Sequence, residues 1–208
     1  MKHIRLSKLM VGLASMSGLI ATLPAAVIIG VDMDSITPGV QSSRTASPGD
    51  LFTATLFMIA DASGVSSYSI SVKFDTGELN LDPGAGASTE FLPPGFTFNF
   101  SPGFATESNA TGDVASFDAA TLGAGPTSTM FDIGTIKFKV ITPLTDALAD
   151  VTPGFFTAGI DGASDNSGAS PAPTFLPGSV NVVPEPASGA LILGGMTVLS
   201  LARRKRTA

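Results

Sequence analysis

Apolar and polar residues alternate with a period of two along several short segments of this chain. In residues 67–74 every second side chain is large and apolar, and serine or lysine stands between them. Residues 96–101 and 135–140 show the same alternation. Because neighbouring side chains of a strand point to opposite faces, each segment predicts a strand with one buried face. Weaker patterns predict six more strands, at 27–33, 51–60, 78–82, 113–120, 153–160 and 175–183.

Turn-forming residues separate these segments. Proline and glycine are adjacent at 48–49, 83–84, 94–95, 102–103 and 153–154. Such pairs favour tight turns. Apolar residues nowhere repeat at helical spacing for three turns, and 143–151 suits at most one short helical turn. The pattern therefore predicts an all-β domain over 27–183, an antiparallel β-sandwich of about nine strands.

The buried faces of the predicted strands define an expected core. It consists of Phe57 or its neighbour Leu56, together with Ile70, Val72, Phe74, Phe117, Ile136, Phe138 and Val140. The chain has no tryptophan and 14 phenylalanines, so phenylalanine must supply most of the bulk. Phe96, Phe98 and Phe100 are expected to belong to the core as well. An exposed binding stripe is the alternative for these three rings.

The first 26 residues differ in composition from the predicted domain. Three basic residues within the first eight precede an apolar run, 9–21, that contains serine and glycine but no charge, and Pro24-Ala25-Ala26 follows. This order of basic, apolar and small residues is that of a secretory signal peptide. We expect 1–26 to be a signal peptide that is cleaved near Ala25 or Ala26. A short transmembrane anchor is the alternative.

Residues 184–208 form a second distinct segment. The motif Val183, Pro184, Glu185, Pro186 is followed by sixteen uncharged residues, 187–202, and then by Arg203, Arg204, Lys205 and Arg206. As a helix the uncharged run would span about 24 Å, which is less than the ~30 Å hydrocarbon core of a bilayer. The basic cluster should remain cytoplasmic by the positive-inside rule. We therefore interpret this transmembrane helix as part of a processing signal rather than a permanent anchor.

The order of motif, glycine-bearing apolar helix and basic cluster resembles the PEP-CTERM sorting signal of bacteria. The resemblance covers 184–208 and the valine before it. It implies that an exosortase-type membrane transpeptidase recognises the motif while the chain is transiently anchored in the inner membrane. The exported domain would then be released or transferred to the cell surface or the exopolysaccharide matrix. A plain tail anchor is the alternative.

The middle of the chain carries a second resemblance. The turn Pro48-Gly49-Asp50 precedes a strand, residues 64–75 have the sequence GVSSYSISVKFD, and 133–140 have the sequence IGTIKFKV. This order is similar to that of cohesin domains, which are nine-stranded jelly-roll sandwiches found in cellulosome scaffoldins and related to carbohydrate-binding modules. The resemblance spans about 48–140 and implies a binding domain of this kind. It does not locate the residues of a dockerin interface.

Composition excludes several classes of chemistry. The chain has no cysteine and one histidine, His3, which lies in the predicted signal peptide. Nucleophilic catalysis that needs a histidine, zinc sites built on histidine or cysteine, haem ligation and iron–sulfur clusters are therefore excluded. Residues 27–183 contain four basic and sixteen acidic residues, a formal net charge of −12. Nucleic acid and anionic lipid are consequently poor partners for the domain.

Carboxylates are the chemically capable side chains that remain. Calcium accepts oxygen ligands, and Asp161, Asp165 and Asn166 cluster in a segment rich in glycine and serine, without the spacing of an EF-hand. These three residues are candidate calcium ligands; the alternative, which the neighbouring glycine, serine and proline residues favour, is a polar loop without a metal. Two acidic residues can also form a glycosidase site. The chain has a single tyrosine and no tryptophan, however, so it offers little aromatic surface to hold a sugar.

The sequence thus predicts a non-enzymatic, exported protein of the cell surface or extracellular matrix. Its role would be structural or adhesive, through binding to extracellular polysaccharide or to a surface protein, and it would require no cofactor. A calcium-dependent carbohydrate-binding module is the first alternative. A carboxylate-based glycan hydrolase is the second and less favoured one.

Overall fold

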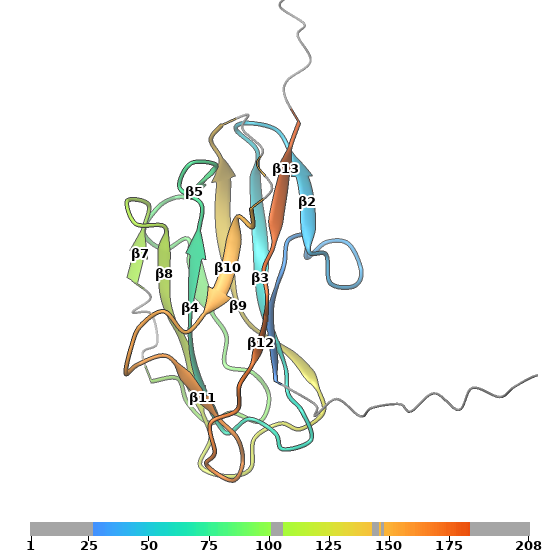
Figure 1. Cartoon of the computed structure of the whole chain (residues 1–208), viewed down its shortest axis with the longest axis vertical. Helices are drawn as coiled ribbons and strands as arrows, with labels where there is room; N and C mark the ends of the chain where they lie inside the picture. The colour runs from blue at the N-terminus through green and yellow to red at the C-terminus, as the bar shows by residue number, and fades with distance from the viewer. Residues whose placement is uncertain (1–26, 101–105, 143–145, 147, 184–208) are drawn as a thin grey trace, which may run out of the picture.

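In the computed structural model the chain forms strands that are joined by turns and loops (Figure 1). The structure describes residues 27–100, 106–142, 146 and 148–183. No helix in these ranges is long and apolar enough to cross a membrane. The described ranges contain thirteen strands: β1 (Ile28–Asp32), β2 (Ser43–Ala46), β3 (Leu51–Ile59), β4 (Ser67–Phe74), β5 (Leu79–Leu81), β6 (Ser88–Glu90), β7 (Thr106–Ser108), β8 (Asp113–Ala120), β9 (Met130–Val140), β10 (Val151–Gly154), β11 (Gly162–Ser164), β12 (Thr174–Leu176) and β13 (Ser179–Val182).

The strands form two larger sheets and one separate pair. The six-stranded sheet has the order β12-β1-β3-β9-β5, and β6 also pairs with β9. The five-stranded sheet has the order β10-β4-β8-β7, and β11 also pairs with β4, whereas β13 and β2 pair with each other. Aromatic contacts join the larger sheets, because the ring of Phe74 on β4 lies 5.4 Å from that of Phe138 on β9. The predicted all-β sandwich is therefore present.

The predicted core is confirmed. Leu56 and Phe57 are both buried, as are all the other residues expected in the core: Ile70, Val72, Phe74, Phe117, Ile136, Phe138 and Val140. These residues lie on β3, β4, β8 and β9, which are the long central strands of the two sheets. Burying each such side chain contributes roughly 1.5–3 kcal/mol, so the core residues of these four strands contribute substantially to stability.

The sandwich is not purely antiparallel, which corrects one prediction. Residues predicted as one strand, 175–183, form two short strands, β12 and β13, that run parallel to β1 and β2 respectively. A parallel pair needs a long connection between its strands, and here the whole sandwich lies between them in the sequence. Short-range alternation carries no information about such distant pairing.

Two other predicted strands differ from the structure. The segment 96–101 is not a strand in its described part: it makes one bridge, between Phe98 and Ala120. Phe96 is buried, but Phe98 and Phe100 are exposed, so the core prediction for these two rings is wrong. The strand predicted at 153–160 is β10, which begins at Val151 and ends at Gly154. Its Pro153 is tolerated because β10 is an edge strand.

Candidate functional site

A groove lined by hydroxyl groups lies over β4, β8 and β11. Its volume is about 380 Å³, and its lining contains five serines: Ser67, Ser69, Ser116, Ser164 and Ser170. Each serine hydroxyl both donates and accepts hydrogen bonds. The alternation of β4 explains part of this surface, because Tyr68 and Ile70 are buried in the core while Ser67 and Ser69, which alternate with them, are less buried.

A β-bulge in β8 supplies Ser116 to the groove. Val114 and Phe117 are three residues apart, yet both are fully buried, whereas strict alternation would place them on opposite faces. The pairing of β4 with β8 shifts register between Ile70 and Val72, opposite this part of β8. Ser116 takes a φ of 69°, which lets the strand absorb the extra residue. The bulge thereby keeps Phe117 in the core and leaves Ser116 at the groove.

Two exposed apolar side chains and one carboxylate complete the chemistry of the groove. Phe100 and Ile160 line it and are 60% and 61% exposed. Asp118 also lines it, and its Oδ1 accepts a hydrogen bond of 2.5 Å from the backbone N–H of Phe100. The backbone N–H of Asp118 donates in turn to Glu90, and burial raises the pKa of the Glu90 carboxyl. Asp118 therefore positions Phe100 beside the serines.

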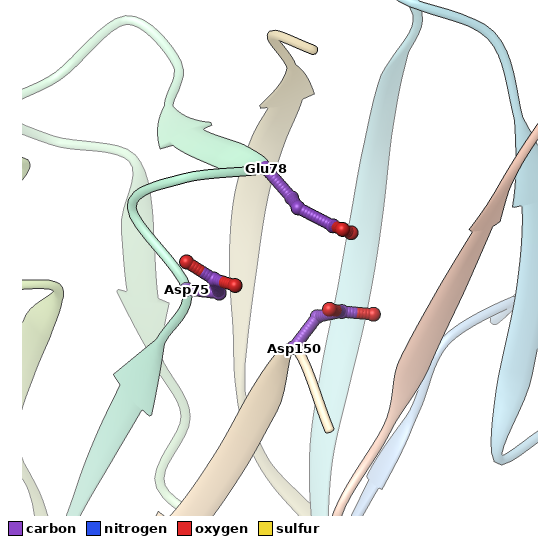
Figure 2. Close-up of side chains that lie close together, drawn as sticks. All are labelled: Asp75, Glu78 and Asp150. Carbon is purple, nitrogen blue, oxygen red and sulfur yellow. The ribbon is translucent and has the colours of Figure 1, made fainter. Parts of the chain in front are cut away.

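A second cluster, which we call the carboxylate trio, consists of Asp75, Glu78 and Asp150 (Figure 2). Asp75 follows β4, Glu78 precedes β5, and Asp150 precedes β10. One carboxylate oxygen from each residue lies within 4.8 Å of the others. Backbone contacts hold the three segments together, since the N–H of Asp75 donates to the carbonyl of Asp150 at 2.8 Å.

Burial shifts the acidity of the trio. Glu78 and Asp150 are 3% and 2% exposed. Burial, together with the negative charge of Asp150, raises the pKa of Glu78 to about 7. Burial also raises the pKa of Asp150, although the backbone N–H of Val180 donates to its Oδ2 and opposes the shift. Both shifts have the same cause: a carboxylate loses its hydration inside the sandwich.

The predicted calcium residues lie around β11 and bond mainly to nearby backbone. Asp161 Oδ2 accepts hydrogen bonds from the N–H groups of Phe156 and Thr157, at 2.8 and 2.7 Å. Asp165 Oδ1 accepts from the N–H and hydroxyl of Ser167, at 2.8 and 2.7 Å, and from the N–H of Ala169, at 2.9 Å. The Asn166 side chain bonds both polar backbone groups of Gly125. These contacts give each side chain a role in fixing its loop, and calcium binding there stays a prediction.

Of the predicted sorting residues, the structure describes Val183 alone. Its side chain is exposed, and its N–H donates to the carbonyl of Ala46 at 2.8 Å, directly after β13. Pro184, Glu185 and Pro186 lie outside the described residues, as do the basic residues 203–206. The sorting signal therefore remains a prediction from the sequence.

Sequence reasoning missed the carboxylate trio. Asp75 and Glu78 are three residues apart, a spacing of acidic residues that is common in turns. Asp150 is distant from them in the sequence. The pairing of β10 with β4, in which Val151 lies opposite Phe74, brings Asp150 beside Asp75. A local signal existed only at Asp75, which directly follows the strongest predicted strand, whereas Asp150 lies in 143–151, where the sequence predicts at most one short helical turn.

No family model matches the chain, and a comparison with curated proteins found no match. Among solved structures, a type I cohesin–dockerin complex from Clostridium thermocellum matches with 14% identity and a TM-score of 0.47, over 75% of this chain and 99% of the other.

Two further cohesin structures are also similar. A type II cohesin domain from the cellulosome of Acetivibrio cellulolyticus has 18% identity and a TM-score of 0.42, over 76% of this chain and 92% of the other. A non-cellulosomal cohesin from Archaeoglobus fulgidus has 12% identity and a TM-score of 0.41, over 77% and 90%.

Proposed function

We propose that this chain is an exported, non-catalytic binding protein of the bacterial cell surface or extracellular matrix. In this proposal the segment 1–26 directs export, and an exosortase-type transpeptidase processes the chain at Pro184-Glu185-Pro186. The β-sandwich is the part that acts outside the cell. The motif order at both ends of the chain supports the location.

The groove over β4, β8 and β11 carries the binding role, and we assign it a neutral extracellular polysaccharide. Its serine hydroxyls match the hydroxyls of a sugar as donors and acceptors. The exposed ring of Phe100 offers one apolar face against which a sugar ring can pack. The net charge of −12 over 27–183 disfavours an anionic polymer.

The lining of the groove also supports a binding role over hydrolysis. Glycoside hydrolysis by acidic residues generally uses two carboxyl groups, one on each side of the scissile bond. Among the described residues that line the groove, Asp118 is the single carboxylate. It already accepts a backbone hydrogen bond from Phe100.

Affinity electrophoresis of the full-length chain tests this role. In gels that contain a soluble neutral β-glucan, we expect the chain to be retarded, and Phe100→Ala to bind about five- to tenfold more weakly. Phe156→Ala is the matched control, because Phe156 is also exposed, at 42%, but lies outside the groove lining. Equal retardation of the two variants would show that the polysaccharide binds outside this groove. No retardation by neutral glucans of different linkage would favour a protein partner.

A further inference from the structure

The carboxylate trio places negative charge inside the sandwich without a basic partner. The ion pairs formed by described residues join Arg44 to Asp34 and Lys73 to Asp113, so neither involves the trio. A buried carboxylate that is neither paired nor hydrated is strongly unfavourable. The trio therefore needs a proton or a cation to compensate its charge.

One oxygen atom of the trio forms no hydrogen bond, although the backbone N–H of Asp146 donates to the same carboxylate. This atom, Oε2 of Glu78, is buried, whereas buried polar atoms almost always find a partner. Figure 2 shows the Glu78 side chain extending toward the carboxylate of Asp150, with Asp75 beside them. The other two carboxylates are fixed by backbone donors, Asp75 by the N–H of Gly77 at 2.6 Å and Asp150 by that of Val180. An unpartnered oxygen thus faces two held carboxylates.

We propose that Asp75, Glu78 and Asp150 bind one calcium ion. Calcium takes oxygen ligands at about 2.4 Å, so two ligands on opposite sides of the ion lie up to about 4.8 Å apart. The three oxygens of the trio lie within 4.8 Å of one another, so no two of them are too far apart to bind the same calcium ion. Magnesium binds at about 2.1 Å with strict octahedral geometry and keeps several waters, so a set of three carboxylates that is held by the fold and largely buried suits calcium better.

The proposed ion would brace one end of the sandwich. Its ligands join the end of β4 to the start of β5 and to the start of β10, and the bond from Val180 to Asp150 adds β13. Ser67, at the groove, and Asp75 lie at opposite ends of β4, about 25 Å apart at the rise of an extended strand. The ion would therefore stabilise the domain without touching a ligand in the groove, and it is distinct from the calcium site predicted around Asp161.

Thermal unfolding of the full-length chain in mild detergent tests the proposal. We expect 1 mM CaCl₂ to raise the Tm by roughly 5–10 °C relative to EDTA if this concentration is about a hundredfold above the Kd, and 1 mM MgCl₂ to raise it far less. Glu78→Gln and, as a second variant at the partly exposed edge of the trio, Asp75→Asn should both lose the calcium shift. Asp165→Asn is the matched control and should keep it. Calorimetric titration with CaCl₂ should show a site that Glu78→Gln lacks and Asp165→Asn keeps.

Three results would overturn the proposal. The first is a Tm that does not change with CaCl₂, together with no heat of binding. The second is a calcium shift that survives in both trio variants. The third is a shift that disappears in Asp165→Asn and persists in Glu78→Gln, which would place the ion in the loop of Asp161, Asp165 and Asn166.

Discussion

At the scale of single residues, one glycine decides how closely the two large sheets approach. Gly134 lies on β9, and the ring of Phe117 on β8 occupies the space where a side chain would begin. A Cβ atom at Gly134 would lie 2.4 Å from Cε1 of Phe117 and 2.8 Å from the carbonyl oxygen of Thr89. The ring is fully buried and the carbonyl belongs to β6, so neither can move away freely. Gly134 is therefore required by packing.

We predict that Gly134→Ala destabilises the protein by about 1–3 kcal/mol, because overpacking forces the surrounding core to shift. The matched control is Gly123→Ala, since nothing lies within 4 Å of a Cβ built at Gly123. That substitution should change stability by no more than about 0.5 kcal/mol. Urea unfolding of both variants measures the difference. Equal stabilities would show that the sheets separate easily at this point.

At the scale of elements, the short strands at the sheet edges are held in place by side-chain hydrogen bonds, because they form few backbone hydrogen bonds to neighbouring strands. Glu107 on β7 illustrates this, because its carboxylate accepts hydrogen bonds from three successive backbone N–H groups, those of Gly86, Ala87 and Ser88. The hydroxyl of Ser88 donates to it as well, at 2.5 Å. β7 belongs to the five-stranded sheet and β6 to the six-stranded one. Glu107 thus ties the two sheets together along one edge.

We predict that Glu107→Ala costs roughly 1.5–3 kcal/mol of stability, the range for hydrogen bonds to a charged group, because its loss leaves partly buried donors unpaired. Glu107→Gln keeps one acceptor oxygen and should cost less. The neighbouring, exposed Thr106 provides the control, and Thr106→Ala should be nearly neutral. Urea unfolding again supplies the measurement. A Glu107→Ala chain as stable as the Thr106→Ala chain would contradict this account of the edge.

The contrast between long central strands and short edge strands explains which elements the sequence could predict. β4 and β9 are long and central, so their alternation between core and surface extends over several residues and was visible in 67–74 and 135–140. β6, β7 and β11 have three residues each, too few for a period of two to stand out. Glu107 accordingly lies outside every strand that the sequence predicts. Its partners, 86–88, are brought to it by the packing of two sheets, which no local pattern encodes.

The candidate sites also differ in how far the sequence alone could predict them. The serines of β4 follow directly from its alternation, whereas Ser116 reaches the groove through a bulge that strict alternation does not predict. The carboxylate trio depends on the pairing of β4 with β10. Asp161 and Asp165 are candidate calcium ligands because they are close in the sequence. In the structure their carboxylates accept hydrogen bonds chiefly from nearby backbone N–H groups.

At the scale of the whole molecule, the proposed activities are separated in space. The groove lies at the β11 end of β4 and the carboxylate trio at its other end. β13 ends at Val182, and the proposed sorting motif follows at once in the sequence. Binding, bracing and sorting can therefore be altered one at a time, by changes at Phe100, at Glu78 and at Glu185.

The intact mass of the protein recovered from the outside of its native cells tests the central claim most directly. We predict a mass that lacks residues 1–26 and the residues after Pro186, because the proposed function requires export, processing at both ends and release or transfer to the surface. Glu185→Gln is the variant in which the second processing step should be slowed. A mass that retains the tail through Ala208 would contradict the account and would make the protein a membrane-tethered surface domain.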